Sequence, residues 1–182
     1  EPGGALPTPS VRLKKDLARS IRRGHPWVYR DALAGSPQHA DGPLVEVLAK
    51  DERFLAVGFW DARSPIAVRI VSTERRCDFG SILPERLAAA LARRLAKLEL
   101  AKTNAFRWVH GEADLLPGVH VDAYGDVATL RFDGAGARAA YRALPDLLKA
   151  AQGLSVRRVV DREERGEGGE LEVRENGLLF GV

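Results

Sequence analysis

The residues of this chain that are best suited to chemistry lie between His110 and Asp122. His110, Glu112 and Asp114 alternate along the sequence, and His120 follows shortly before Asp122. Alternate positions on a strand share a face, so these side chains could gather a metal ion or pair two carboxylates for acid–base work. Glycines and a proline interrupt the same stretch, however, and aspartates in such loops cap backbone amides. We therefore favour a structural turn over a metal or catalytic site.

A second distinctive stretch runs from Arg19 to Arg30 and mixes arginines with a glycine, a proline and aromatic residues. Arginines supply positive charge for phosphates and planar groups for bases. Gly24 permits a turn with positive φ, and the following proline pushes His25 into an extended conformation. Trp27 and Tyr29 are two residues apart, so on a strand they would share one face. This combination is typical of an RNA-binding surface.

Several single residues leave more than one interpretation open. His25 either contacts RNA or bonds a neighbouring carbonyl, and catalysis is the weakest interpretation because no nucleophile lies near it in sequence. Trp27, Tyr29, Phe59 and Trp60 are candidate stacking platforms, although we assign Trp27 and Phe59 mainly to packing. Cys77 is more plausibly a spectator thiol than a nucleophile.

The glycine-bearing turns do not form a recognisable phosphate-binding loop. Gly134 and Gly136 follow an expected strand and precede an expected helix, but their spacing stops short of a dinucleotide-binding fingerprint. The sequence also lacks a Walker motif and a serine nucleophile elbow. We therefore predict no catalytic, cofactor-binding or metal-binding residue in this chain, and we expect the chain alone to be inactive.

The elements that must position these residues divide into two parts. Residues 1–10 are expected to be a flexible leader, and 11–75 a small β-barrel with one short helix that Asp16 caps and that ends near Gly24. Its later strands are predicted from alternating and β-branched runs at 44–49, 54–60 and 66–72.

From Pro84 the hydrophobic period changes to that of a helix. Leucines at 87, 91, 95 and 98 mark one face of a helix that ends near Leu100. Strands are expected at 106–110, 119–123, 127–132, 156–160, 171–173 and 178–180, and a second helix at 137–151, within which Pro145 marks a kink or a new first turn. Residues 79–182 are thus predicted to form an α+β domain with two helices against an antiparallel sheet, and 163–169 a charged loop.

Composition narrows the class of protein. The 182 residues carry a net charge of +3, but seven basic and two acidic residues fall in the first 30, which leaves −2 for the remainder. A concentration of positive charge on one segment indicates a nucleic-acid partner. No apolar run approaches the roughly 20 residues needed to span a bilayer, the start does not resemble a signal peptide, and the single cysteine cannot form an internal disulfide. We expect a cytoplasmic protein with no membrane partner.

Four stretches taken in order resemble one known family. They read RGHPWVY from Arg23, GFWD from Gly58 with SPIAVR from Ser64, HGEADLLPGVHVDAYGD from His110, and ENGLLF from Glu175. They are similar to the class I S-adenosylmethionine-dependent methyltransferases of the RlmI type, which modify cytosine C5 in large-subunit ribosomal RNA.

The resemblance implies that 11–75 form a PUA-type RNA-binding barrel and 79–182 a central domain. In that family a Rossmann-like domain follows, which holds S-adenosylmethionine and the catalytic cysteine. We expect that domain to be missing from this chain, which stops at Val182, so no catalytic or cofactor residue is transferred to it.

Taken together, the sequence predicts the RNA-binding and substrate-positioning portion of an rRNA methyltransferase. The alternative is a non-catalytic RNA-binding or scaffold module in which the aromatic segment and the 87–98 helix bury a homodimer interface. The candidate RNA contacts are Lys14, Lys15, Arg19, Arg22, Arg23, Gly24, His25 and Tyr29.

Overall fold

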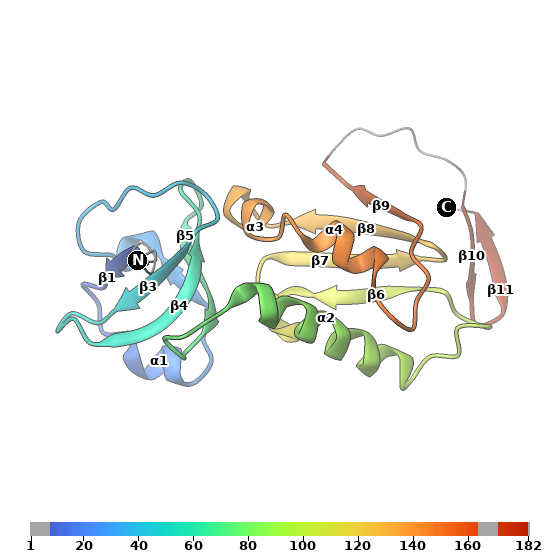
Figure 1. The fold of residues 1–182 in the computed structure, drawn as a ribbon, viewed down its shortest axis with the longest axis horizontal. Coiled ribbons are helices and arrows are strands. Elements are labelled where there is room, and N and C mark those ends of the chain that lie inside the picture. Colours follow the sequence, from blue (N-terminus) through green and yellow to red (C-terminus); the bar gives the residue numbers. More distant parts are fainter. Residues whose placement is uncertain (1–7, 164–170, 182) are drawn as a thin grey trace, which may run out of the picture. The chain divides into compact units, whose positions relative to one another are not determined.

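The computed structural model describes residues 8–163 and 171–181, and every structural statement below concerns these residues (Figure 1). Most of the expected leader at 1–10 and most of the expected loop at 163–169 lie outside the described residues. The chain divides into two compact units. The first comprises 1–77 together with 134–140, and the second comprises 78–133 together with 141–182.

The first unit is built on a five-stranded sheet that curves into a half-barrel. In spatial order its strands are β1 (Ser10–Arg12), β3 (Leu44–Leu48), β4 (Phe54–Trp60), β5 (Ile66–Ser72) and β2 (Trp27–Tyr29). Strand β1 runs parallel to β3, whereas the other neighbours are antiparallel. The helices of this unit are α1 (Ala18–Arg22), the 3-10 turn η1 (Arg30–Ala32) and α3 (Ala135–Ala140).

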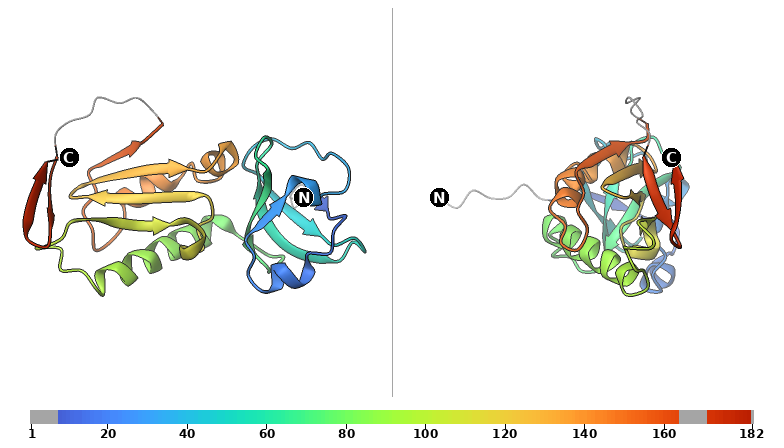
Figure 2. Two further views of the ribbon diagram at one scale, coloured as in Figure 1. Left: turned by 180° about the vertical axis from the view of Figure 1, so that it is seen from behind. Right: turned by 90° about the vertical axis from the view of Figure 1, so that its right-hand side faces the viewer.

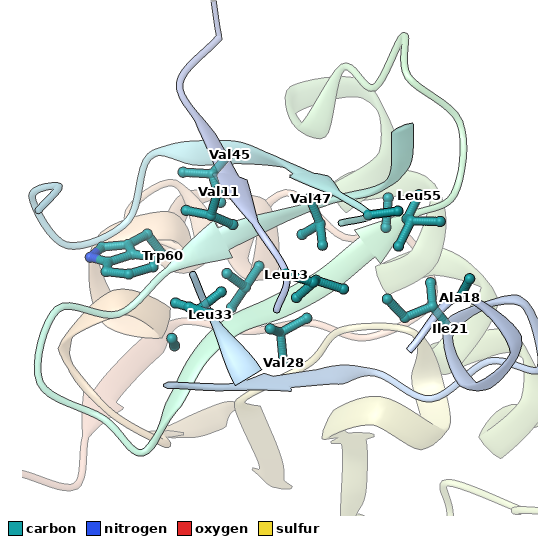
Figure 3. Close-up of a cluster of buried hydrophobic side chains, with 14 residues drawn as sticks. Val11, Leu13, Ala18, Ile21, Val28, Leu33, Val45, Val47, Leu55 and Trp60 are labelled. Atoms are coloured by element: carbon teal, nitrogen blue, oxygen red, sulfur yellow. The ribbon is translucent and has the colours of Figure 1, made fainter. Parts of the chain in front are cut away.

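The core of the first unit is a cluster of buried hydrophobic side chains contributed by the strands and by α1 (Figure 3). Strand β3 alternates as the sequence predicts, with Val45 and Val47 buried between half-buried neighbours. Ile21 of α1 and Val28 of β2 join the same cluster, together with Trp60. These contacts fix α1 and the edge strand β2 against the sheet, so the Arg19–Arg30 segment is anchored at both of its ends.

The second unit is a four-stranded sheet with two helices on one face, as Figures 1 and 2 show. The sheet order is β6 (Ala105–His110), β7 (Val119–Tyr124), β8 (Val127–Phe132) and β9 (Arg158–Asp161). The helices are α2 (Phe79–Leu95) and α4 (Leu144–Lys149), with a 3-10 turn η2 (Gly111–Asp114) after β6. A separate hairpin consists of β10 (Glu172–Glu175) and β11 (Leu178–Gly181).

Three details differ from the sequence-based expectation. Strand β9 pairs with β8 in parallel, so the expected antiparallel sheet is mixed. A parallel neighbour needs a crossover connection, which the helical stretch after β8 supplies. The expected helix at 137–151 is two helices, because Pro145 opens the first turn of α4. Helix α2 begins before Pro84, because the Asp78 carboxylate accepts a hydrogen bond from the Gly80 amide and caps an earlier start, and it ends at Leu95 instead of near Leu100.

The glycine turn before α3 is shaped by contact with strand β4. Asp61, which is buried, accepts hydrogen bonds from the amides of Ser64 (2.9 Å) and Gly136 (3.1 Å). A Cβ on Gly136 would lie 2.4 Å from the Trp60 carbonyl oxygen, and one on Gly134 would meet the Asp61 carboxylate. Both glycines are therefore required for close packing inside the first unit.

Candidate nucleic-acid interface

Helix α1 and the turn that follows it present the candidate arginines. Ala18 and Ile21 are buried, so the opposite side of this short helix faces solvent. Asp16 Oδ1 accepts a hydrogen bond from the Ala18 amide at 3.1 Å, but the N-cap position belongs to Leu17, one residue later than expected, and carries no side-chain cap. Gly24 has φ +91°, and a Cβ there would meet nothing within 4 Å. The predicted positive φ is confirmed, and it is backbone conformation rather than space that favours glycine at this position.

A shallow hollow of about 650 Å³ brings four of the eight candidate residues together. We call it the arginine hollow; it is lined by Asp16, Arg19, Ser20, Arg23, Gly24 and His25. Arg19 and Arg23 are both exposed, four residues apart, and therefore project from the same side of the helix end. Arg22 is also exposed but does not line the hollow.

An aromatic ladder continues from the arginine hollow along β2. The His25 and Trp27 ring centroids are 6.0 Å apart, and those of Trp27 and Tyr29 are 6.4 Å apart, both pairs meeting edge to face. Val28 points into the core while Tyr29 is 42% exposed. The prediction that Trp27 and Tyr29 share one face is confirmed. Trp27 is half-buried and Phe59 is fully buried, which agrees with packing for Phe59, and Trp60 is also buried and belongs to the core rather than to a stacking surface.

The two candidate lysines lie just before α1. Lys14 is exposed, and Lys15 Nζ is 2.6 Å from Asp31 Oδ2. The hydrogen bond from Lys15, together with its charge and that of Lys14, lowers the pKa of Asp31 below its ordinary value of 3.8. Both members of the ion pair are more than half exposed, and exposed pairs contribute little stability. A phosphate can therefore replace Asp31 as the partner of Lys15 at small cost.

Sequence reasoning missed two cations near this surface. The β3–β4 turn carries Lys50 and Arg53, which the sequence identifies only as part of a hairpin connection. Their position follows from the pairing of β1 with β3, which places the segment before α1 beside that turn. The position of these two cations therefore depends on strand pairing between distant segments. Counting charges along the sequence could not predict it.

The Asp114 carboxylate belongs to a structural ion cluster. It is 3% exposed, and its two oxygens lie 2.6 Å from Arg93 and 2.6 and 2.7 Å from Arg94, and 2.6 Å from the His110 amide. Burial alone raises the pKa of Asp114, but the hydrogen bonds from Arg94, Arg93 and the His110 amide outweigh it. The pKa therefore lies below 3.8, and the carboxylate stays charged and engaged with α2.

The histidines of the same motif pair across β6 and β7. Their ring centroids are 5.4 Å apart, with His110 Nδ1 3.2 Å from Arg107 and His120 Nε2 3.3 Å from Asp133. Arg107 also donates two hydrogen bonds to Asp122, at 2.7 and 3.2 Å. Within 8–163 and 171–181, no group of three or more histidine, cysteine, aspartate or glutamate side chains is placed to hold a metal. The geometry therefore supports the structural interpretation of this motif.

Leu115 is a strained and exposed residue at the end of η2. Its φ is +58°, which leucine rarely adopts, and 62% of the residue is exposed. We expect Leu115→Gly to raise the free energy of unfolding by about 0.5–1 kcal/mol, because relief of the left-handed strain exceeds the extra entropy of glycine in the unfolded chain. Urea unfolding measures the change. A loss of stability would contradict it and would show that the leucine side chain has a packing role.

The remaining candidates from the sequence do not line the arginine hollow. Leu87 and Leu91 are buried within the second unit, so two leucines of the helical face suggested for a homodimer pack inside it. Cys77 is half-buried. Beside the turn at Gly134 and Gly136, a Cβ on Gly134 would meet the Asp61 carboxylate, and a Cβ on Gly136 would meet backbone atoms of Trp60 and Asp61. In the part of the chain that the structure describes, no helix combines the length and apolar character needed to cross a membrane.

Comparison with known proteins matches the first part of the chain to a recognised domain. Residues 11–73 match the family model described as a PUA-like domain. The chain is 38% identical over 129 residues to "Ribosomal RNA large subunit methyltransferase I" of Alteromonas mediterranea, covering 69% of this chain and 32% of that protein. It is 33% identical over 136 residues to "Ribosomal RNA large subunit methyltransferase" of Deinococcus radiodurans, covering 71% and 33%.

The fold is also known from solved structures. A Streptococcus mutans protein described as a candidate SAM-dependent methyltransferase matches 96% of this chain and 48% of its own, with a TM-score of 0.76 at 14% identity. A second structure, of a candidate methyltransferase complexed with SAH, gives a TM-score of 0.74 at 15% identity. The chain spans about a third of the length of the curated relatives it matches. It therefore contains a PUA-like domain and is homologous, over that portion of their length, to the ribosomal RNA large subunit methyltransferases.

Proposed function

We propose that this chain is the RNA-binding and substrate-positioning portion of a SAM-dependent rRNA cytosine-C5 methyltransferase that acts in the cytoplasm. Methyl transfer would be carried out by a catalytic domain outside these 182 residues, in a protein of the length of the curated relatives. The observation that carries the proposal is the arginine hollow, joined to the aromatic ladder within the PUA-like domain.

The charge of this surface suits a polyphosphate backbone. Arg19, Arg22 and Arg23 are exposed, and no ion pair to an acidic side chain is found for them among the described residues. Guanidinium groups that are not held by internal carboxylates are available for phosphates, and the counterions they release make binding salt-dependent. Gly24 carries no side chain and so lets a ligand approach the backbone between the arginines and His25.

The aromatic ladder favours RNA with unpaired bases. Tyr29 is 42% exposed and lies at the edge of the sheet, where a splayed base can stack on it or on His25. Stacking on an aromatic side chain contributes about 1–3 kcal/mol per base. Duplex RNA hides those faces, so the ladder and the arginines together select structured RNA that also exposes single-stranded positions.

A triple variant tests this proposal. We expect Arg19→Ala/Arg22→Ala/Arg23→Ala to weaken binding of a 23S rRNA fragment at least tenfold at low salt. The slope of log affinity against log salt should fall by about 2, because each lost phosphate contact on single-stranded RNA removes about 0.7. Fluorescence anisotropy across a salt series gives both quantities.

The control removes the same charge elsewhere. Arg76, Arg142 and Lys149 are all exposed and do not line the arginine hollow. The variant in which these three are alanine should bind within about threefold of the wild type and keep its salt slope. Equal losses in the two variants, or tight RNA binding by the Arg19/Arg22/Arg23 variant, would refute the assignment of the surface.

A further inference from the structure

A second hollow of about 480 Å³ lies next to the arginine hollow. We call it the lysine hollow; its lining is Leu13, Lys15, Asp16, Leu17, Ala49, Lys50, Asp51, Arg53 and Leu55. Its apolar residues belong to the edge of the first unit's core, and its cations stand at the rim. Asp16 lines both hollows and is the residue that they share.

The cations of the lysine hollow are held in place by local backbone structure. The β3–β4 turn is closed by a hydrogen bond from the Ala49 amide to the Arg53 carbonyl at 2.8 Å, and Glu52 adopts a φ of +64°. Arg53 lies 3.5 Å from Asp51 with both side chains more than half exposed. Such a pair contributes little stability, so Arg53 can turn to a phosphate. Lys50 is exposed, and Lys15 forms an exposed ion pair with Asp31.

The negative charge of Asp16 is unexpected on a surface proposed to bind phosphates. Oδ1 accepts the Ala18 amide, while Oδ2 has no hydrogen-bond partner within the described residues. A carboxylate between two cationic hollows repels a polyanion, which weakens binding unless the ligand brings a donor to it. In a nucleic-acid strand, the group between two consecutive phosphates is the sugar. The donor that RNA has there, and DNA lacks, is the ribose 2′-hydroxyl.

We propose that adjacent phosphates of one RNA strand occupy the arginine and lysine hollows, and that Asp16 Oδ2 accepts a hydrogen bond from the 2′-hydroxyl of the ribose between them. This inference rests on the proposed function of the surface. Asp16 is then the residue that distinguishes RNA from DNA. The surface that contacts the RNA strand also extends to Lys50 and Arg53.

The test of Asp16 compares three single-stranded oligonucleotides of one sequence: RNA, DNA and 2′-O-methyl RNA. The variants are Asp16→Asn, whose amide oxygen can still accept from the Ala18 amide while its NH₂ group cannot accept a hydrogen bond, and Asp16→Ala, which can neither accept from the 2′-hydroxyl nor donate to it. Hydrogen bonds to charged groups are among the stronger ones, so loss of this one should lower the ratio of RNA to DNA affinity about tenfold or more. The wild type should bind 2′-O-methyl RNA more weakly than RNA, and the variants should not distinguish them.

If Asp16 acts only through its negative charge, a different result is expected. Glu74 is exposed and lines neither hollow, so Glu74→Gln removes the same charge and should leave the RNA to DNA ratio unchanged. If Asp16→Asn strengthens RNA and DNA binding by equal factors, Asp16 acts only through its charge and the proposal is wrong. Coincident thermal melts of wild type and variants establish that the fold is kept.

The lysine hollow is tested separately. Lys50→Ala/Arg53→Ala should lower the salt slope by about 1.4, on the basis of 0.7 for each of two contacts. An unchanged salt slope would mean that RNA does not contact the lysine hollow, and it would overturn the proposal. The Arg19/Arg22/Arg23 variant would still test the arginine hollow separately. A chain that binds no RNA at all would instead refute the proposed function.

Discussion

Replacing Asp114 by alanine should lower the free energy of unfolding by about 3 kcal/mol, because breaking a buried ion pair leaves its partners uncompensated. The carboxylate is 3% exposed and bonds two guanidinium groups and one backbone amide. Arg94 is only 21% exposed at its side chain, so water replaces the lost partner poorly. Urea unfolding followed by circular dichroism measures the loss.

A matched acidic residue supplies the control. Glu85 is exposed on the same helix α2, and its replacement by alanine should change stability by less than about 0.5 kcal/mol. If Asp114→Ala costs less than about 1 kcal/mol, the motif at His110–Asp114 is not the structural anchor described above, and a functional role for its carboxylate returns.

The same residue predicts a dependence on pH. The pKa of Asp114 in the folded protein lies below 3.8, its ordinary value. The stability it contributes is therefore fully present above about pH 3.8 and is lost as pH falls through the lower folded pKa. The stability difference between wild type and Asp114→Asn should shrink when the pH is lowered from about 5 to about 2.5. A constant difference over that range would contradict the assignment.

Replacing Gly136 by alanine is expected to destabilise the first unit by about 3 kcal/mol. Helix propensity alone predicts the opposite, since alanine is favoured over glycine in a helix by about 1 kcal/mol. The new methyl group would lie 2.4 Å from the Trp60 carbonyl oxygen and 2.8 Å from the Asp61 Cα, which are backbone atoms that cannot move aside. Moving α3 away instead breaks the bond from the Gly136 amide to Asp61, leaving a buried carboxylate oxygen without that donor.

Thermal denaturation separates the two effects. A methyl group added at Gly181 would meet no atom within 4 Å, and the φ of Gly181 is not positive. Gly181→Ala is therefore the matched glycine-to-alanine control and should be nearly neutral. A rise in melting temperature for Gly136→Ala would mean that helix propensity dominates and that the contact with β4 is not tight.

Local patterns in the sequence predicted the positions of many strands and turns. Strands β4, β5 and β8 lie where alternation and β-branched residues place them, and the turn at Gly24 has the positive φ that its glycine suggests. These features depend on neighbours in sequence. The direction of β9 depends instead on where the crossover after β8 returns the chain, and no local pattern encodes that.

The candidate interface shows the same division. The shared face of Trp27 and Tyr29 follows from strand geometry and was predictable. The role of Gly136 depends on Asp61, which is 75 positions away in sequence, so the glycine spacing suggested a weak nucleotide motif and not a packing contact. Lys50 and Arg53 were missed for the same reason, because a hairpin turn gives no sign of which hollow it borders.

The placement of residues 134–140 in the first unit bears on how these proteins can be dissected or recombined. The first unit cannot be separated by cutting the chain at Cys77. Its Asp61 carboxylate accepts a hydrogen bond from the Gly136 amide of helix α3, which follows strand β8 in the sequence. Gene fusion or domain exchange at residue 77 would separate the two. Duplication or transfer of the RNA-binding module should therefore involve the whole stretch through α3, so that the two units are inherited together.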